Sequence, residues 1–154
     1  MARWYRLSLM ALILLVVSAS TLSSSLQGQV VDGQGQPRFT KAPNGVITDR
    51  ATGLDWYVGQ ENNWHQAKAW AEGLTVAGGG WRLPTIAELK AIYQKGASRN
   101  HMDPIFQAPG AWAWSGEMYD ARSAYGFAFY SGLVNSHGLD YAYGRLALAV
   151  RSRR

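Results

Sequence analysis

Two segments late in the chain alternate large and small apolar residues, and this alternation limits the possible folds more than any other feature of the sequence. Successive side chains of a strand point to opposite faces, so an alternating segment predicts a strand with one bulky face. The bulky residues are Tyr125, Phe127 and Phe129 in the first segment (123–131) and Leu146, Leu148 and Val150 in the second (145–151). We expect both bulky faces to line the core, with room for another layer against the small residues of the first segment.

Two helices are predicted earlier in the chain. Asn62 or Asn63 can cap the first, and apolar residues follow at helical spacings of three and four. The second begins with a capping box, in which the Thr85 hydroxyl accepts a hydrogen bond from the backbone N–H of Glu88 and the Glu88 carboxylate accepts one from that of Thr85. Gly96 lies where the C-terminal cap of this helix is expected. We therefore interpret Glu88 as a structural residue, with a catalytic acid as the alternative.

Two short strands, at 46–49 and 54–58, precede these helices, and Gly53 can adopt a positive φ in the turn between them. Segment 100–110 contains two prolines and is expected to be a loop. Helices near the start and antiparallel strands near the end together predict an α+β fold. It is a single domain in which two helices pack on a twisted antiparallel β-sheet.

The first 19 residues have the pattern of a secretory signal peptide, with basic residues, an apolar stretch and small residues at the end. The apolar stretch is shorter than the roughly 20 residues of a membrane-spanning helix, so cleavage after Ala19 or Ser20 is expected, with an uncleaved anchor as the alternative. Residues 20–37 are rich in Ser, Gly and Gln and are interpreted as a flexible linker, which leaves one domain at 38–152. We expect an exported protein, located in the periplasm, at the cell surface or outside the cell.

The absence of cysteine and a modest positive charge narrow the possible chemistries and partners. Without cysteine there are no thiol nucleophiles, thiolate metal ligands or disulfides. Two of the 15 basic residues lie in the signal peptide, which leaves 13 against 10 acidic residues, and three arginines lie among the last four residues. This basic terminus can attract nucleic acid, acidic glycans or anionic lipid, or can simply be solvated. For an exported protein we expect no nucleic-acid partner, and membrane contact only through an uncleaved signal segment; the oligomeric state is not indicated.

Short motifs follow one another in a fixed order through the domain. They are Gly45-Val-Ile-Thr-Asp49, Thr52-Gly-Leu-Asp-Trp56, Trp64-x-x-Ala67, Trp81-Arg-Leu-Pro-Thr85-x-x-Glu88-Leu89, Trp114-Ser115-Gly116 and Ala149-Val-Arg151. The series resembles the Lcl C-terminal-domain-like family from about Phe39 to Arg151, and the Trp-Arg-Leu-Pro-Thr block is its most specific element. The resemblance implies a fold related to C-type lectins and to formylglycine-generating enzymes. It also implies a protein of the bacterial surface or envelope, one named example being the terminal domain of a collagen-like adhesin that binds acidic glycans.

This sequence departs from the family pattern in two respects. It has no collagen-like repeat, so trimeric adhesion is not carried over, and it lacks the Cys with which the family often closes. The formylglycine-generating relatives bind copper through cysteines, so their activity is not carried over either. His65, His101 and His137 are isolated, and no nucleophile elbow or phosphate-binding loop is present. We expect no enzyme activity, no cofactor and no metal.

Arg82 and four tryptophans of the motifs are interpreted as scaffold. A half-buried guanidinium needs a carboxylate partner, for which the candidates are Glu88, Glu117 and Asp103. The tryptophans expected to fill the core are Trp56, Trp64, Trp81 and Trp114. Contact with a ligand is the alternative for all five residues.

The segment 117–144 is the expected ligand-binding surface, because it combines aromatic and polar residues suited to sugar or peptide recognition. These residues are Tyr119, Asp120, Arg122, Asn135, His137, Asp140, Tyr141 and Tyr143. The resemblance adds that long loops carry ligands at this position in lectin-like folds; ordinary hairpins with exposed tyrosines are the alternative. Three of the residues, Asp120, Asn135 and Asp140, could also hold Ca²⁺, although no ordered ligand loop supports this.

The sequence thus predicts an exported, non-enzymatic, lectin-like domain that binds a glycan or an envelope or extracellular protein. The alternatives are an interaction or structural subunit of an envelope assembly and, less favoured, a cryptic enzyme.

Overall fold

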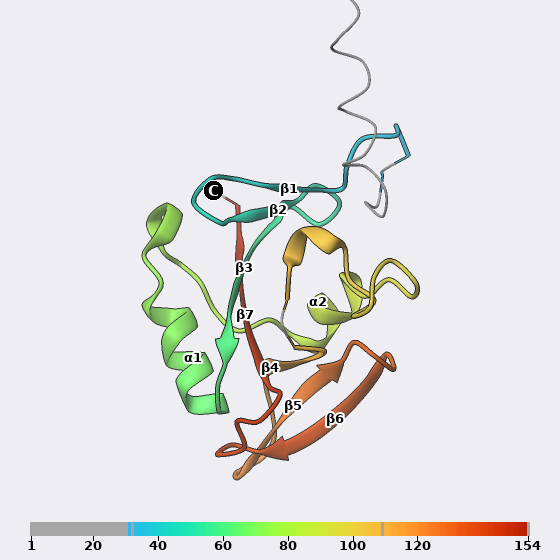
Figure 1. The fold of residues 1–154 in the computed structure, drawn as a ribbon. Coiled ribbons are helices and arrows are strands. Elements are labelled where there is room, and N and C mark those ends of the chain that lie inside the picture. Colours follow the sequence, from blue (N-terminus) through green and yellow to red (C-terminus); the bar gives the residue numbers. More distant parts are fainter. Residues whose placement is uncertain (1–30, 32, 109, 154) are drawn as a thin grey trace, which may run out of the picture.

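The computed structural model describes Val31, residues 33–108 and residues 110–153. The signal peptide expected at 1–19 and most of the linker expected at 20–37 lie outside these residues. Seven strands form one sheet in the order β1-β2-β3-β7-β4-β5-β6, and all neighbours are antiparallel except β7 and β4 (Figure 1). The strands are β1 Phe39–Lys41, β2 Ile47–Asp49, β3 Leu54–Glu61, β4 Trp112–Asp120, β5 Ser123–Ala128, β6 Leu133–Gly138 and β7 Leu146–Ser152.

Two helices, α1 (Trp64–Gly73) and α2 (Ile86–Ala91), complete the fold. Figure 1 shows them on either side of the central strands β3 and β7. Within the described part of the chain, no helix combines the length and the apolar character needed to cross a bilayer. The predicted α+β fold, two helices on a mostly antiparallel sheet, is confirmed.

The last strand in sequence, β7, lies in the middle of the sheet between β3 and β4. Its large residues pack with Leu89 and Ile92 in one core cluster, whereas Ala147 and Ala149 pack with α1 in a second. The predicted alternation of 145–151 is confirmed. The alanine face is buried as well, because small side chains let α1 approach the sheet closely.

The helix starts agree with the sequence, but the end of α2 does not. Asn63 caps α1, and both hydrogen bonds of the Thr85–Glu88 capping box are present, at 3.1 and 2.8 Å. The prediction that α2 ends near Gly96 is wrong, because the helix ends at Ala91. Gly96 lies in a later turn, where it has a φ of 89° and its N–H donates to a histidine ring.

The expectation of long loops in 117–144 is wrong for most of this segment. Strands β4, β5 and β6 run through it as an antiparallel meander, in which β5 and β6 pair without interruption from Ser123↔Gly138 to Ala128↔Leu133. β4 and β6 pair with the two edges of β5, while its bulky face is covered by Leu89 and Ile92, which share a core cluster with Phe127 and Phe129. The alternative interpretation of this segment, hairpins with exposed tyrosines, describes the observed backbone.

Candidate functional site

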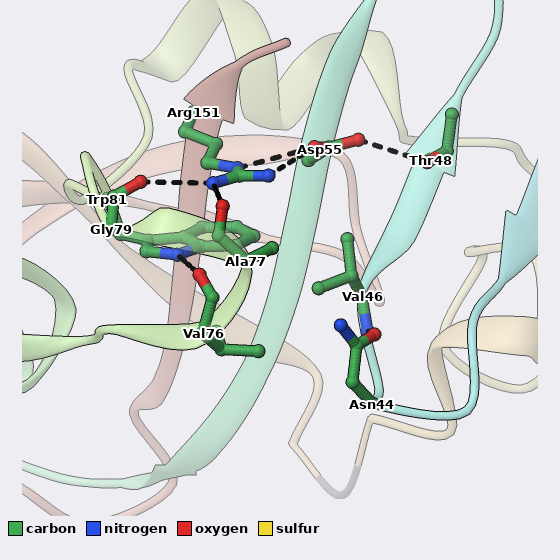
Figure 2. A network of polar contacts seen from close by, with 9 residues as sticks. All are labelled: Asn44, Val46, Thr48, Asp55, Val76, Ala77, Gly79, Trp81 and Arg151. Carbon is green, nitrogen blue, oxygen red and sulfur yellow. Dashed lines mark hydrogen bonds and ion pairs between the residues drawn. The ribbon is translucent and has the colours of Figure 1, made fainter. Parts of the chain in front are cut away.

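Arg151 is the centre of a polar network that joins β7, β3, β2 and the loop before Trp81 (Figure 2). Its Nη2 atom lies 3.0 Å from Oδ2 of Asp55, and its Cζ atom lies 4.8 Å from the centroid of the Trp81 ring. Asp55 also accepts a hydrogen bond from the Thr48 hydroxyl at 3.0 Å. Only 13% of the Arg151 side chain and 8% of the Asp55 side chain are exposed, so the charged pair is nearly buried.

The loop before Trp81 is shaped to receive the Arg151 guanidinium. Ala77 has a φ of 51°, and Gly78, Gly79 and Gly80 all have positive φ, a conformation that glycine adopts without strain. Two carbonyl groups of this loop, those of Ala77 and Gly79, accept hydrogen bonds from Nη1 of Arg151 (Figure 2). This loop therefore binds a cation of the protein itself through its carbonyl groups.

Arg82 pairs with Glu88, one of its three expected partners. Two guanidinium nitrogens donate to the two carboxylate oxygens at 2.9 and 2.7 Å, and the Arg82 side chain is 46% exposed. Burial raises the pKa of Glu88, but hydrogen bonds from Arg82 and from the Thr85 backbone outweigh it and hold that pKa below its ordinary value. Glu88 thus serves both the cap of α2 and the ion pair, as its structural interpretation predicts.

Substitution of Arg82 by alanine is expected to lower the free energy of unfolding by about 1 kcal/mol, because the lost pair is bidentate but half exposed. Urea denaturation followed by tryptophan fluorescence measures the change. Lys90→Ala, at an exposed position of α2, is the control and should change stability by a few tenths of a kcal/mol at most. Equal effects of the two substitutions would contradict the structural role of Arg82.

The four tryptophans expected in the core are all buried, with 0 to 7% of each residue exposed. Three of them donate their indole N–H to backbone carbonyls of neighbouring segments: Trp64 to Ser115, Trp81 to Val76 and Trp114 to Asn62. A buried indole usually has such a partner. Trp56 has no such partner among the described residues, but it is fully buried in the main core cluster, so all four rings are scaffold, as predicted.

The residues predicted to bind a ligand fall into separate groups. Tyr119, Asp120 and Arg122 lie at the exposed β4–β5 hairpin, where Asp120 accepts a hydrogen bond from the backbone N–H of Arg122. His137 and Tyr141 stack on each other near the start of β7, with ring centroids 5.7 Å apart. The other three, Asn135, Asp140 and Tyr143, are exposed.

The group near the start of β7 is centred on Arg145, a residue that was not predicted. The Cζ atom of Arg145 lies 4.2 Å from the centroid of the Trp112 ring and 4.7 Å from that of Tyr141. Its Nη2 atom is 3.1 Å from Nε2 of His137, and the His137 ring meets the Trp112 ring edge-on at 5.0 Å. We refer to Trp112, His137, Tyr141 and Arg145 as the Arg145 cluster.

The Arg145 cluster holds a half-buried cation without a carboxylate partner. Within the described residues, no Asp or Glu oxygen lies within 4.0 Å of the Arg145 nitrogens. Four buried side-chain polar atoms of the described chain have no hydrogen-bond partner, and two of these, Arg145 Nε and Trp112 Nε1, belong to the cluster. Both are donors. Burial lowers the pKa of Arg145, although Tyr141, Tyr130 and Glu61 act in the opposite direction.

Buried donors without acceptors are rare in proteins, and each one needs an explanation. A guanidinium stacked on aromatic rings presents its remaining N–H groups in a plane, the arrangement that matches a carboxylate, sulfate or phosphate group. The Arg145 cluster can therefore bind an anionic group.

Two other possible sites are less well supported. The described residues contain no group of three or more His, Asp or Glu side chains that could hold a metal ion. A cavity of about 200 Å³ lies within 98–108, but Asn100 and Asp103 at its wall make hydrogen bonds to the backbone of the same loop. Neither feature points to a ligand.

Sequence reasoning missed Arg145 and Trp112 because nothing local marks either residue as exceptional. Arg145 was interpreted as the first residue of the last strand, and Trp112 was not singled out. The nearest signal was the pair of tyrosines just before Arg145, Tyr141 and Tyr143, which were predicted. The surroundings of Arg145 come from two strands and a loop that are distant in sequence, so only the folded structure shows that it has no carboxylate partner among the described residues.

Comparison with protein families matches residues 45–151 to the Lcl C-terminal domain. No curated protein matches the chain.

Proposed function

We propose that this chain, which belongs to the Lcl C-terminal domain family, is an exported, non-enzymatic domain that binds a glycan through the Arg145 cluster. The acidic groups of the glycan, carboxylate or sulfate, are bound by Arg145. The observation that carries the proposal is the half-buried Arg145 guanidinium, which stacks on Trp112 and Tyr141 and has no Asp or Glu oxygen within 4.0 Å among the described residues.

Aromatic residues in and near the Arg145 cluster also favour a sugar ligand. Tyr143 is 84% exposed, Tyr141 is 47% exposed, and Tyr130 is close enough to affect the pKa of Arg145. Exposed tyrosine rings suit sugar recognition because they combine an apolar face with a polar hydroxyl at low entropic cost. The signal-peptide pattern and the family resemblance are consistent with a binding role outside the cytoplasm.

Arg145→Gln tests the proposal on an array of acidic and neutral oligosaccharides. The unaltered protein is expected to bind acidic members only, and the substitution to weaken that binding by about tenfold or more, as expected for loss of a charge-assisted hydrogen bond. Isothermal titration with the best acidic oligosaccharide gives the affinities, and circular dichroism checks that the variant is folded.

Arg122→Gln is the matched control, because Arg122 is an exposed arginine of the other predicted group, at the β4–β5 hairpin. Its affinity should stay within about twofold of the unaltered protein, since single exposed charges contribute little. A loss with Arg122→Gln and none with Arg145→Gln would move the site to that hairpin. No binding to any member of the array would remove the basis for glycan recognition.

Docking of a protein partner is a second candidate function. Seven large apolar side chains are exposed in the described residues, and six of them lie between Met118 and Tyr143. Contiguous exposed apolar surface favours a protein interface, and these six residues lie along the β4–β5–β6 meander and the loop that follows it. Crosslinking in the native envelope fraction separates the two candidate functions. Only protein docking predicts a specific crosslinked partner, and the substitutions Tyr119→Ser or Leu133→Ser should abolish that crosslink.

A further inference from the structure

We infer that anion binding at the Arg145 cluster is coupled to protonation of His137, so that the site binds more tightly as the pH falls. The inference rests on the proposed function in taking Arg145 as the anion-binding residue. Its observation is the contact between the two side chains: Nη2 of Arg145 lies 3.1 Å from Nε2 and 3.4 Å from Nδ1 of His137.

This contact requires a neutral imidazole in the free protein. The guanidinium carries only donors and keeps its charge at any physiological pH, so it needs a ring nitrogen that can accept. Protonation of His137 would turn both ring nitrogens into donors and place two cations in contact. Burial first, and the charge of Arg145 second, hold the pKa of His137 below its ordinary value.

The surroundings of His137 do not relieve this repulsion. Trp112 on β4 and Tyr141 after β6 contact the ring with their own rings, and Ala124 is the cross-strand neighbour on β5. Within the described residues, no carboxylate forms an ion pair with His137. Glu61, which acts on Arg145, accepts a hydrogen bond from the Gly144 backbone N–H at 3.0 Å.

An anion beside Arg145 changes this balance. It attracts both cations, so the protonated form of His137 becomes favourable and its pKa rises in the complex. Binding then takes up a proton from solvent. Linked equilibria are reciprocal: if the bound anion raises the affinity of His137 for a proton, protonation of His137 raises the affinity of the site for the anion by the same factor. The anion therefore binds more tightly at acid pH.

Sulfate is a suitable probe, because its charge does not change between about pH 5 and pH 8. We expect the dissociation constant of sulfate to fall by about fivefold between pH 7.5 and pH 5.5, a typical size for coupling between two sites. Titrations followed by the NMR signal of the Trp112 indole N–H give this constant. The imidazole signal of His137 should titrate at higher pH with saturating sulfate than without it.

His137→Gln keeps a hydrogen-bonding side chain but does not titrate, so it should bind sulfate equally at both pH values. The other histidines, His65 and His101, remain in this variant and therefore control for effects elsewhere. Equal affinity of the unaltered protein at both pH values, or a pH dependence that persists in His137→Gln, would overturn this inference alone. No sulfate binding at either pH would overturn the anion site itself, and with it the proposed function.

Discussion

Replacing Arg151 by alanine is expected to lower the free energy of unfolding by about 3–5 kcal/mol, the cost of leaving one partner of a buried ion pair alone. Asp55 would remain nearly buried without its cation, and the carbonyl groups of Ala77 and Gly79 would lose their shared donor. A loss of this size removes a large fraction of the stability of a small domain. Urea denaturation, and a melting temperature lower by about 10 °C or more, measure it.

Arg153→Ala is the control for Arg151. It removes another arginine from the same end of the chain, but an exposed one, and should change stability by less than about 0.5 kcal/mol. Combining Arg151→Ala with Asp55→Ala should cost less than the sum of the single substitutions, because the double variant leaves no unpaired charge. Strictly additive effects would contradict a direct pairing of the two residues.

Gly126→Ala is expected to destabilise the domain by about 3 kcal/mol, at the upper end of what overpacking costs. A Cβ atom at this position would lie 2.0 Å from Cη2 of Trp112 and 2.5 Å from the carbonyl oxygen of Ala113. The backbone oxygen cannot move without distorting the β4–β5 pairing. The Trp112 ring must move as well, and with it the aromatic surface on which Arg145 stacks.

Gly138→Ala makes the same chemical change on the adjacent strand, where the nearest atom is 4.0 Å from the added carbon. Its stability should stay within about 0.5 kcal/mol of the unaltered protein. Thermal unfolding of both variants shows whether any alanine in these strands destabilises the domain or only the one at position 126. The NMR signal of the Trp112 indole shows whether the added Cβ displaces that ring. Similar stability of the two variants would contradict the close contact between Gly126 and Trp112.

Features that depend on neighbours in sequence could be predicted. The capping box at Thr85 and the cap at Asn63 involve residues three positions apart, so the sequence contains both partners of each hydrogen bond. The alternation in 145–151 likewise predicts a strand from its own residues. The end of α2 was misplaced because the turn that follows it depends on a backbone hydrogen bond from Gln94 to His101.

Features that depend on distant contacts could not be predicted. The alternation in 123–131 predicted β5, but the family resemblance implied long loops in the rest of 117–144, and no local pattern showed that β5 pairs with both β4 and β6. The candidate site shows the same limit more sharply. His137 and Tyr141 were predicted from residue type, but Arg145 became a candidate only when its surroundings showed a cation with aromatic neighbours and no carboxylate.

The central position of β7 governs how a nascent chain can fold. Before residues 146–152 leave the ribosome, β3 and β4 lack the strand that lies between them, and the apolar surfaces that later meet α1 and α2 stay exposed to solvent. The sheet closes only through contacts that are far apart in sequence, which slows folding. Completion of the fold therefore waits for the synthesis of β7, and shorter ribosome-bound chains expose apolar surface that chaperones can bind.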